Sequence, residues 1–260
     1  MNIHRTLTAA LMLLCPFVAL AGEVVLDIPT RPGVTQRLLL AEPAAPRAVA
    51  VLFAGGHGGL RIFPGGSFRW GEGNFLVRSR GLFVQRDIAV ALIDTPSDRQ
   101  MPPYLDGFRN TSAHVADIAA VIAALRKRFN VPVWLVGTSR GTQSVAFAAA
   151  ELSGASAPDG MVLTSPILKD DATAPVPALA LHKVRVPTLV IHHENDQCAN
   201  CLAADLPALE AALQHAPRFE RVTFNGGTSK GNPCGGYAFH GFNGIEDEVV
   251  ARMAAWITAR

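Results

Sequence analysis

The segment Gly137–Gly141 reads Gly-Thr-Ser-Arg-Gly, which has the residue types and spacing of a serine nucleophile held in a sharp turn. The apolar run Val133–Val136 precedes it, and a segment of small residues with helical character follows. In such a context a strand turns tightly into a helix and lifts the serine hydroxyl above the edge of a sheet. A Cβ at either flanking glycine would collide with the neighbouring strand or helix. We therefore expect Ser139 to be a nucleophile whose oxyanion is favoured by the N-terminus of the following helix.

The elements around this motif alternate between strand-like and helix-like patterns. Glu23–Ile28 and Thr35–Ala41 flank a turn at 31–33 (Arg-Pro-Gly) and predict a hairpin. Short, apolar, mostly β-branched runs are typical of strands buried on both faces, and they occur at 48–54, 88–93, 133–136, 160–164, 188–192 and 219–224. Helical periodicity appears at 74–85, 112–129, 202–215 and 245–259. The order predicts an α/β fold with a mostly parallel, doubly wound sheet, an antiparallel N-terminal hairpin and helices on both faces.

The motif and its setting resemble the α/β-hydrolase superfamily, in particular serine esterases and dienelactone-hydrolase-like members, over nearly all of the chain after residue 21. The resemblance implies an acid after a later strand and a histidine near the C-terminal end, in the order Ser, acid, His. Asp196 follows the predicted strand at 188–192, and His240 lies between the last predicted strand and the terminal helix. The implied triad is thus Ser139, Asp196 and His240, and the short stretch from Ser139 to Asp196 leaves little room for a cap domain.

Two points in this pattern stay open. His193 stands where the family usually has Gly, so the geometry of the acid turn departs from the usual one. Glu194 and the pair Asp170/Asp171, which follows the preceding strand, are alternative acids.

A glycine-rich loop follows the predicted strand at 48–54. The resemblance implies that one backbone N–H of this loop, from Gly56 or His57, joins the amide of Arg140 in binding the oxyanion. The segments at 60–73 and 95–110 would wall the pocket, with Phe63, Trp70 and Tyr104 as candidate substrate contacts. Aromatic walls suit an apolar acyl or aryl group, arginines in the same segments would suit an anionic one, and packing between loops is the alternative. No nucleotide-binding Gly-x-x-x-x-Gly-Lys-Ser/Thr motif occurs.

Three cysteines follow residue 21: Cys198, Cys201 and Cys234. If the implied triad forms, the acid loop and the histidine loop converge, and we then expect a Cys198–Cys234 disulfide. A local Cys198–Cys201 bridge, a redox site, and zinc binding by these two cysteines with nearby histidines are the alternatives.

Residues 1–21 have the pattern of a secretory signal peptide. Arg5 precedes an apolar run from Leu7 to Leu20, and the run ends in an Ala-Leu-Ala site at 19–21. The alternatives are an uncleaved anchor and a lipoprotein at Cys15. We predict one domain over residues 22–260 and a periplasmic or secreted protein with no integral membrane span after cleavage.

Composition excludes several functional classes. The chain has 260 residues, of which 49% are hydrophobic and 17% charged, so it is not intrinsically disordered. Its net charge of +2 is too weak for a nucleic-acid footprint. We expect an exported serine hydrolase, carboxylesterase-like, that needs no cofactor or metal and acts on small-molecule esters. The alternatives are a non-catalytic binding protein on the same fold and an acyltransferase, a thioesterase, a lactonase or a peptidase. The sequence carries no signal for an oligomeric state.

Overall fold

A central mixed sheet organises the chain, seen in the computed structural model, which describes residues 22–170 and 172–259. The sheet is built from β1 (Val24–Arg31), β2 (Val34–Ala41), β3 (Ala48–Phe53), β4 (Ile88–Pro96), β5 (Val133–Thr138), β6 (Gly160–Thr164), β7 (Thr188–His193) and β8 (Phe219–Phe224). The helices are α1 (Phe75–Val84), α2 (Ser112–Phe129), α3 (Gly141–Glu151), α4 (Leu206–Ala212) and α5 (Glu246–Thr258). The predicted signal peptide at 1–21 lies outside the described residues.

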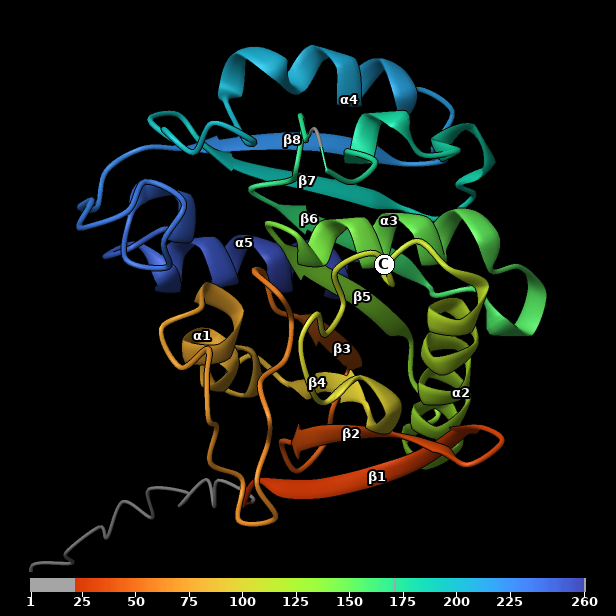
Figure 1. The fold of residues 1–260 in the computed structure, drawn as a ribbon. Coiled ribbons are helices and arrows are strands. Elements are labelled where there is room, and N and C mark those ends of the chain that lie inside the picture. Colours follow the sequence, from red (N-terminus) through yellow and green to blue (C-terminus); the bar gives the residue numbers. More distant parts are fainter. Residues whose placement is uncertain (1–21, 171, 260) are drawn as a thin grey trace, which may run out of the picture.

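The strands follow the order β1-β2-β4-β3-β5-β6-β7-β8 in one eight-stranded sheet. β2 runs antiparallel to β1 and β4, and every other neighbouring pair is parallel. Figure 1 shows β8 at one edge of the sheet and the β1–β2 hairpin at the other. The predicted hairpin and mostly parallel sheet are confirmed. The carboxyl ends of all the parallel strands therefore lie at the same edge of the sheet.

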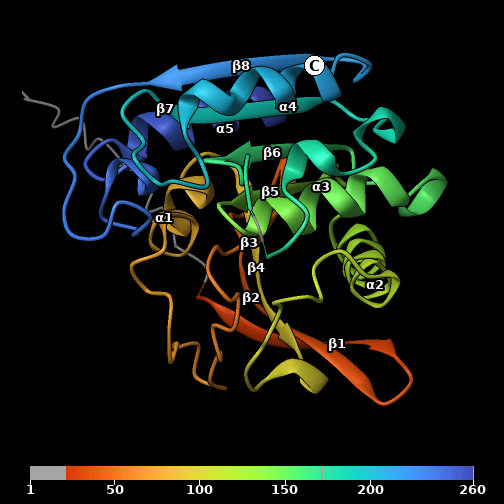
Figure 2. The same ribbon diagram turned by 45° about the horizontal axis from the view of Figure 1, so that its top comes forward.

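Period-two alternation along the strands divides the interior into two cores, because successive side chains point to opposite faces of a sheet. In β3, Val49 and Val51 pack with the helices α2, α3 and α4, whereas Ala50 and Leu52 pack with α1 and α5. Figure 2 shows the sheet between these helical layers. Both faces being covered is the physical reason why the strand sequences read as nearly continuous apolar runs.

The helix expected at 202–215 is shorter in the structure. Residues Ala203–Asp205 form a 3₁₀ turn, and α4 begins only at Leu206. Pro207 is the second residue of α4, and its ring would clash with a preceding helical turn, so a helix can begin there but cannot extend upstream. The other predicted helices agree with the structure to within a residue or two.

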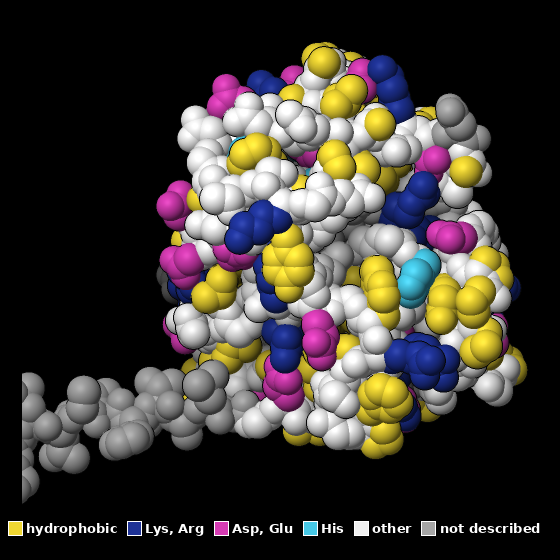
Figure 3. All heavy atoms as spheres, turned by 60° about the vertical axis from the view of Figure 1, so that its left-hand side comes forward, with side chains coloured by type: hydrophobic (Ala, Val, Ile, Leu, Met, Phe, Trp, Pro, Cys, Tyr) yellow, Lys and Arg dark blue, Asp and Glu magenta, His cyan; other side chains and the backbone are white. Residues whose placement is uncertain are grey.

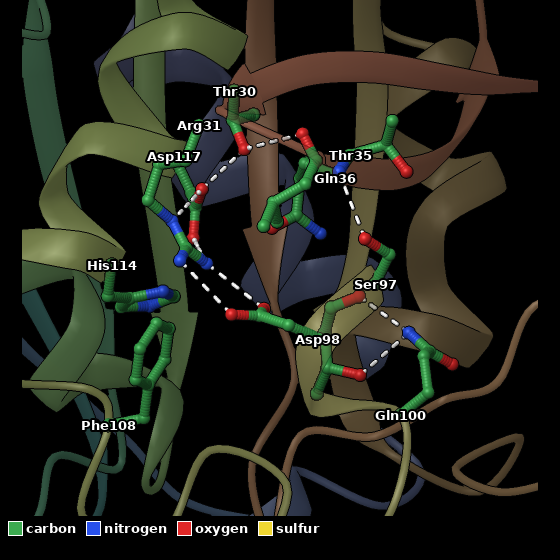
Figure 4. A network of polar contacts seen from close by, with 12 residues as sticks. Thr30, Arg31, Thr35, Gln36, Ser97, Asp98, Gln100, Phe108, His114 and Asp117 are labelled. Atoms are coloured by element: carbon green, nitrogen blue, oxygen red, sulfur yellow. Dashed lines mark hydrogen bonds and ion pairs between the residues drawn. The ribbon is translucent and has the colours of Figure 1, made fainter.

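An ion-pair network around one buried carboxylate fastens the hairpin to α2 (Figure 4). Asp117 on α2 is fully buried and accepts hydrogen bonds from Arg31 Nε at 2.9 Å and Nη2 at 3.0 Å. Thr30 Oγ1 donates to the same carboxylate, and Arg31 also pairs with Asp98 at 3.0 Å. These bonds satisfy a carboxylate that would otherwise be costly to bury.

Between β6 and β7 the described chain holds only loops and two short 3₁₀ turns, at Val176–Ala178 and Leu181–Lys183. The expected absence of a large cap domain is thus confirmed for this part of the chain. Within the ranges that the structure describes, no helix has the length and apolar character needed to cross a membrane.

Candidate active site

The turn between β5 and α3 holds Ser139 in left-handed backbone geometry, with φ of 52°. Its amide donates to the carbonyl of Thr164 at 3.0 Å, and its own carbonyl accepts from the amide of Thr142 at 2.9 Å. A Cβ on Gly137 would lie 2.6 Å from the carbonyl oxygen of Gly141, and a Cβ on Gly141 would overlap the carbonyl oxygen of Phe53 on β3. The sequence therefore places glycine where only glycine fits. The close packing around the turn holds Ser139 in a left-handed backbone conformation that would be strained without it.

Asp196 and His240 come together although 44 positions separate them. Nδ1 of His240 lies 2.8 Å from Oδ2 of Asp196, and both side chains are almost fully buried. The other carboxylate oxygen of Asp196 accepts the amide of Cys198 at 2.9 Å. Asp196 is therefore fixed as an acceptor, while Nε2 of His240 is buried and has no hydrogen-bond partner among the described residues.

His193 holds the acid turn at the point where the family pattern would have Gly. Its Nδ1 accepts the amide of Asn195 at 3.0 Å, so the opposite nitrogen, Nε2, can donate to the carbonyl of Gly226 at 3.0 Å. The ring also stacks on Phe239, next to His240, with centroids 4.6 Å apart. One imidazole thus connects the acid turn after β7 to two segments that follow β8, one at Gly226 and one at Phe239. The sequence predicts that His193 lines or supports the site, and the structure gives it this bracing position.

Ser165 secures the histidine from a second side. It follows β6 directly, and its hydroxyl donates to the carbonyl of His240 at 2.8 Å. No motif marked this serine in the sequence. Its place at the carboxyl end of a buried strand was the available signal.

A disulfide joins the acid and histidine loops, as predicted. Cys198 and Cys234 are bonded, with Cα atoms 4.5 Å apart. Cys201 is free and buried, and burial raises the pKa of its thiol. Ligand atoms of Cys198, Cys201 and His240 lie within 4.8 Å of one another, but the sulfur of Cys198 belongs to the disulfide and is no thiolate ligand, so the zinc alternative does not fit these residues.

Ser139 and His240 line one cavity of about 280 Å³ at the carboxyl edge of the sheet. Backbone forms much of its wall, because seven of the lining residues are glycines: Gly55, Gly56, Gly71, Gly73, Gly235, Gly236 and Gly241. Trp70, Phe75 and Tyr237 add aromatic surface. Figure 3 shows this side of the molecule, where hydrophobic side chains lie beside a histidine.

Of the three predicted oxyanion residues, only Gly56 lines this cavity, and Arg140 lines a second one. No protein acceptor in the described part of the chain takes up the amide of Gly56, His57 or Arg140. The ring of His57 is stacked between Trp70 and Tyr104, at centroid distances of 4.1 and 4.4 Å, and burial lowers its pKa. The loop is therefore held by aromatic contacts, with backbone donors left free.

Of the three predicted substrate contacts, the structure brings only Trp70 to the cavity wall. Phe63 is 45% exposed and does not line the cavity, and Tyr104 packs on the far side of the His57 ring. Both belong to long loops whose course no local pattern specifies. Asp170, one of the alternative acids, pairs with Arg140 at 2.6 Å instead of with His240.

Comparison with known proteins identifies similar folds. No family model matches the chain, and no curated protein matches its sequence. A dienelactone hydrolase from Anabaena variabilis superposes with a TM-score of 0.62 at 16% identity, covering 90% of this chain and 96% of that one. The Pyrococcus furiosus esterase PF2001 gives 0.65 at 13% identity, covering 90% of each chain. A serine hydrolase without lid from Xanthomonas campestris gives 0.56 at 19% identity, covering 92% and 96%. With the strand order and the serine turn described above, these similarities show that the chain has the fold of the α/β-hydrolase superfamily.

Proposed function

We propose that this protein is a serine hydrolase that cleaves an ester-type acyl bond, with Ser139 as nucleophile, His240 as general base and Asp196 as its orienting acid. One observation carries the proposal. The Asp196 bond leaves Nε2 of His240 unpartnered at a cavity that Ser139 also lines. The similarity of the fold to esterases and a dienelactone hydrolase supports the same reading.

In the proposed reaction, Nε2 of His240 accepts the proton of the Ser139 hydroxyl as that oxygen attacks the ester carbonyl carbon. The bond from Nδ1–H to Asp196 keeps the ring in the required tautomer and stabilises the imidazolium that forms. Amides of the Gly56–His57 loop and of Arg140 bind the oxyanion. His240 then protonates the leaving alcohol. In the second half, water attacks the acyl-enzyme carbonyl carbon as Nε2 of His240 accepts its proton, and His240 returns that proton to the Ser139 oxygen as the bond to the acyl carbon breaks.

The size of the cavity favours small substrates. About 280 Å³ is slightly below the usual range of small-molecule pockets, and the glycine walls leave few side chains that could rearrange. Aromatic surface from Trp70 and Phe75 suits an apolar acyl or alcohol group. We therefore expect short-chain or aryl esters to be preferred over long-chain esters.

The test compares Ser139→Ala with Ser156→Ala, a matched change at an exposed serine away from the cavity. On a panel of aryl esters of increasing acyl length, Ser139→Ala should lower kcat by roughly 10⁴-fold or more with an unchanged melting temperature. A fluorophosphonate should label the parent and the Ser156→Ala protein but not Ser139→Ala. Equal rates for the parent and Ser139→Ala would refute the assignment, and hydrolysis-free transfer to an added alcohol would indicate an acyltransferase.

We also propose that residues 1–21 are removed on export, so that the protein functions outside the cytoplasm. The disulfide supports this proposal, because disulfides persist in oxidising compartments. Expression of the full chain in a bacterium with a periplasm, followed by N-terminal sequencing, should give a product that begins at Gly22. An intact N-terminus on a cytoplasmic product would contradict it.

A further inference from the structure

Arg109 lies beneath the loop that the proposed function uses to bind the oxyanion. It precedes α2, its residue exposure is only 5%, and no carboxylate lies within ion-pair distance of it among the described residues. Its Nη2 donates to the carbonyl of Gly56 at 2.8 Å, and its Nη1 donates to the hydroxyl of Ser144 on α3 at 3.0 Å. One guanidinium thus joins the glycine-rich loop after β3 to the helix that begins at the serine turn.

This contact fixes the direction of a peptide group. In a trans peptide the C=O and the N–H point in opposite directions, so a Gly56 carbonyl bound to Arg109 turns the N–H of His57 away from Arg109. Gly56 lines the cavity that holds Ser139, whereas Arg109 lines a separate cavity of about 300 Å³. The peptide therefore stands between the two cavities, with its carbonyl on the Arg109 side.

Neighbouring contacts pack the loop against Arg109 and against the segment that precedes it. A Cβ at Gly58, where φ is 78°, would lie 2.8 Å from Nη2 of Arg109. The amide of Leu105 donates to the carbonyl of His57 at 3.2 Å. Beyond Ser144, Nε2 of His114 completes the chain of hydrogen bonds at 3.0 Å.

The positive charge of Arg109 strengthens, as a donor, the same peptide N–H that its hydrogen bond orients. Burial lowers the pKa of Arg109 to about 10, so the guanidinium is still cationic at neutral pH. The carboxylate of Asp106 is near enough to oppose this effect, but its residue is exposed and its field is screened by solvent. A cation bonded to a peptide carbonyl polarises that peptide and strengthens its N–H as a donor.

We propose that Arg109 is a positioning residue for oxyanion binding: through the Gly56 carbonyl it holds the loop so that its backbone amides face Ser139. The inference rests on the serine-hydrolase function proposed above. It predicts that Arg109 affects the stability of the transition state and leaves the affinity for the ground-state substrate nearly unchanged. The reason is that Arg109 bonds to the loop backbone and does not contact a substrate in the cavity.

The experiment measures kcat and KM for one aryl ester, together with the inhibition constant of an aryl boronic acid, which forms a tetrahedral adduct on a nucleophilic serine. Arg109→Met should lower kcat by about 10²-fold with KM changed less than about 3-fold, since losing one oxyanion donor has an effect of this size. The boronic acid should bind more weakly by a similar factor. Arg109→Lys, which keeps the charge, should lose less. Arg128→Met, at an exposed arginine on the far end of α2, is the matched control and should match the parent.

Two further arms keep the test decisive if Arg109→Met does not fold. Ser144→Ala removes one anchor of Arg109 and should lower kcat about 10-fold, because a hydrogen bond from a cationic guanidinium contributes more than a neutral one. Arg109→Ala should regain kcat in a saturable way when methylguanidinium is added, because the adjoining cavity of about 300 Å³ gives access to the vacated position.

The outcomes separate the two proposals. If the parent neither hydrolyses esters nor binds the boronic acid, the proposed function fails and this inference falls with it. If the parent does both, but Arg109→Met keeps kcat within a factor of three, or loses only through KM, or binds the boronic acid as tightly as the parent, the positioning role alone is overturned.

Discussion

The disulfide between Cys198 and Cys234 offers a quantitative test of how the two loops of the site are held. The bond closes a loop with a sequence separation of 36 residues. In the chain-entropy account, a loop of this size removes enough freedom from the unfolded chain to stabilise the fold by ~4 kcal/mol. For a domain of this length that corresponds to a melting temperature lower by roughly 8–15 °C when the bond is absent.

The perturbation has to remove both cysteines. With Cys234 alone replaced, the freed thiol of Cys198 would lie within 4.8 Å of Cys201 and could form a local bridge with it. We therefore expect Cys198→Ala/Cys234→Ala to lose ~4 kcal/mol of unfolding free energy. Cys201→Ala keeps the disulfide and should lose only about 1 kcal/mol, since it removes one small buried group.

Urea denaturation of the parent, the double variant and Cys201→Ala, without reductant, measures the difference. The parent under strong reductant should approach the double variant. Catalytic activity should fall in the double variant even where it is fully folded, because the backbone amide of Cys198 itself donates to the Asp196 carboxylate and the disulfide holds that turn in place. A loss below 1 kcal/mol in the double variant, or unchanged activity, would refute the idea that the disulfide holds the acid and histidine loops together.

Three further predictions follow from buried groups elsewhere. Gly141→Ala should abolish activity and destabilise the fold, because its Cβ would overlap the carbonyl oxygen of Phe53; a folded variant with the parent's kcat would contradict the reading of the serine turn. Burial lowers the pKa of His192 to about 4 from 6.5, so the unfolded chain binds the extra proton between these pH values. Stability should therefore decline as pH falls from about 6.5 to 4, by ~3 kcal/mol from this residue, and His192→Gln should flatten the decline in urea denaturation measured at pH 5 and 7.5. Asp117→Ala should lower the free energy of unfolding by about 2 kcal/mol, because Arg31 loses charge-assisted bonds but keeps its pair with Asp98; calorimetry showing an unchanged melting temperature would count against a stabilising network.

Much of the site could be predicted from the sequence because it depends on residues close together in the chain. Gly137 and Gly141 are needed by the serine turn alone, since the clashes they avoid are with their immediate surroundings and one neighbouring strand. The position of Asp196 after a buried strand was likewise a local signal, because parallel strands end at one edge of the sheet. The Cys198–Cys234 bond could be predicted only by assuming that the loops around Asp196 and His240 converge.

Other parts of the site depended on contacts between distant segments. Phe63 and Trp70 belong to the same loop and have similar chemistry, yet only Trp70 reaches the cavity, because packing against Gly56 and His57 decides the course of that loop. Arg109 carries no motif, and its role follows only from the carbonyl that it meets in the folded chain.

By itself, the sequence determined the alternation of strands and helices, the sharp turn at Ser139 and the identity of the acid and histidine candidates, because periodicity and glycine requirements act over a few residues. Tertiary structure alone decided which imidazole braces the acid turn, which aromatic side chains face the cavity and which guanidinium holds the glycine-rich loop. Those choices come from the packing and hydrogen bonding of segments far apart along the chain, and the energies involved exist only once the sheet has brought the segments together.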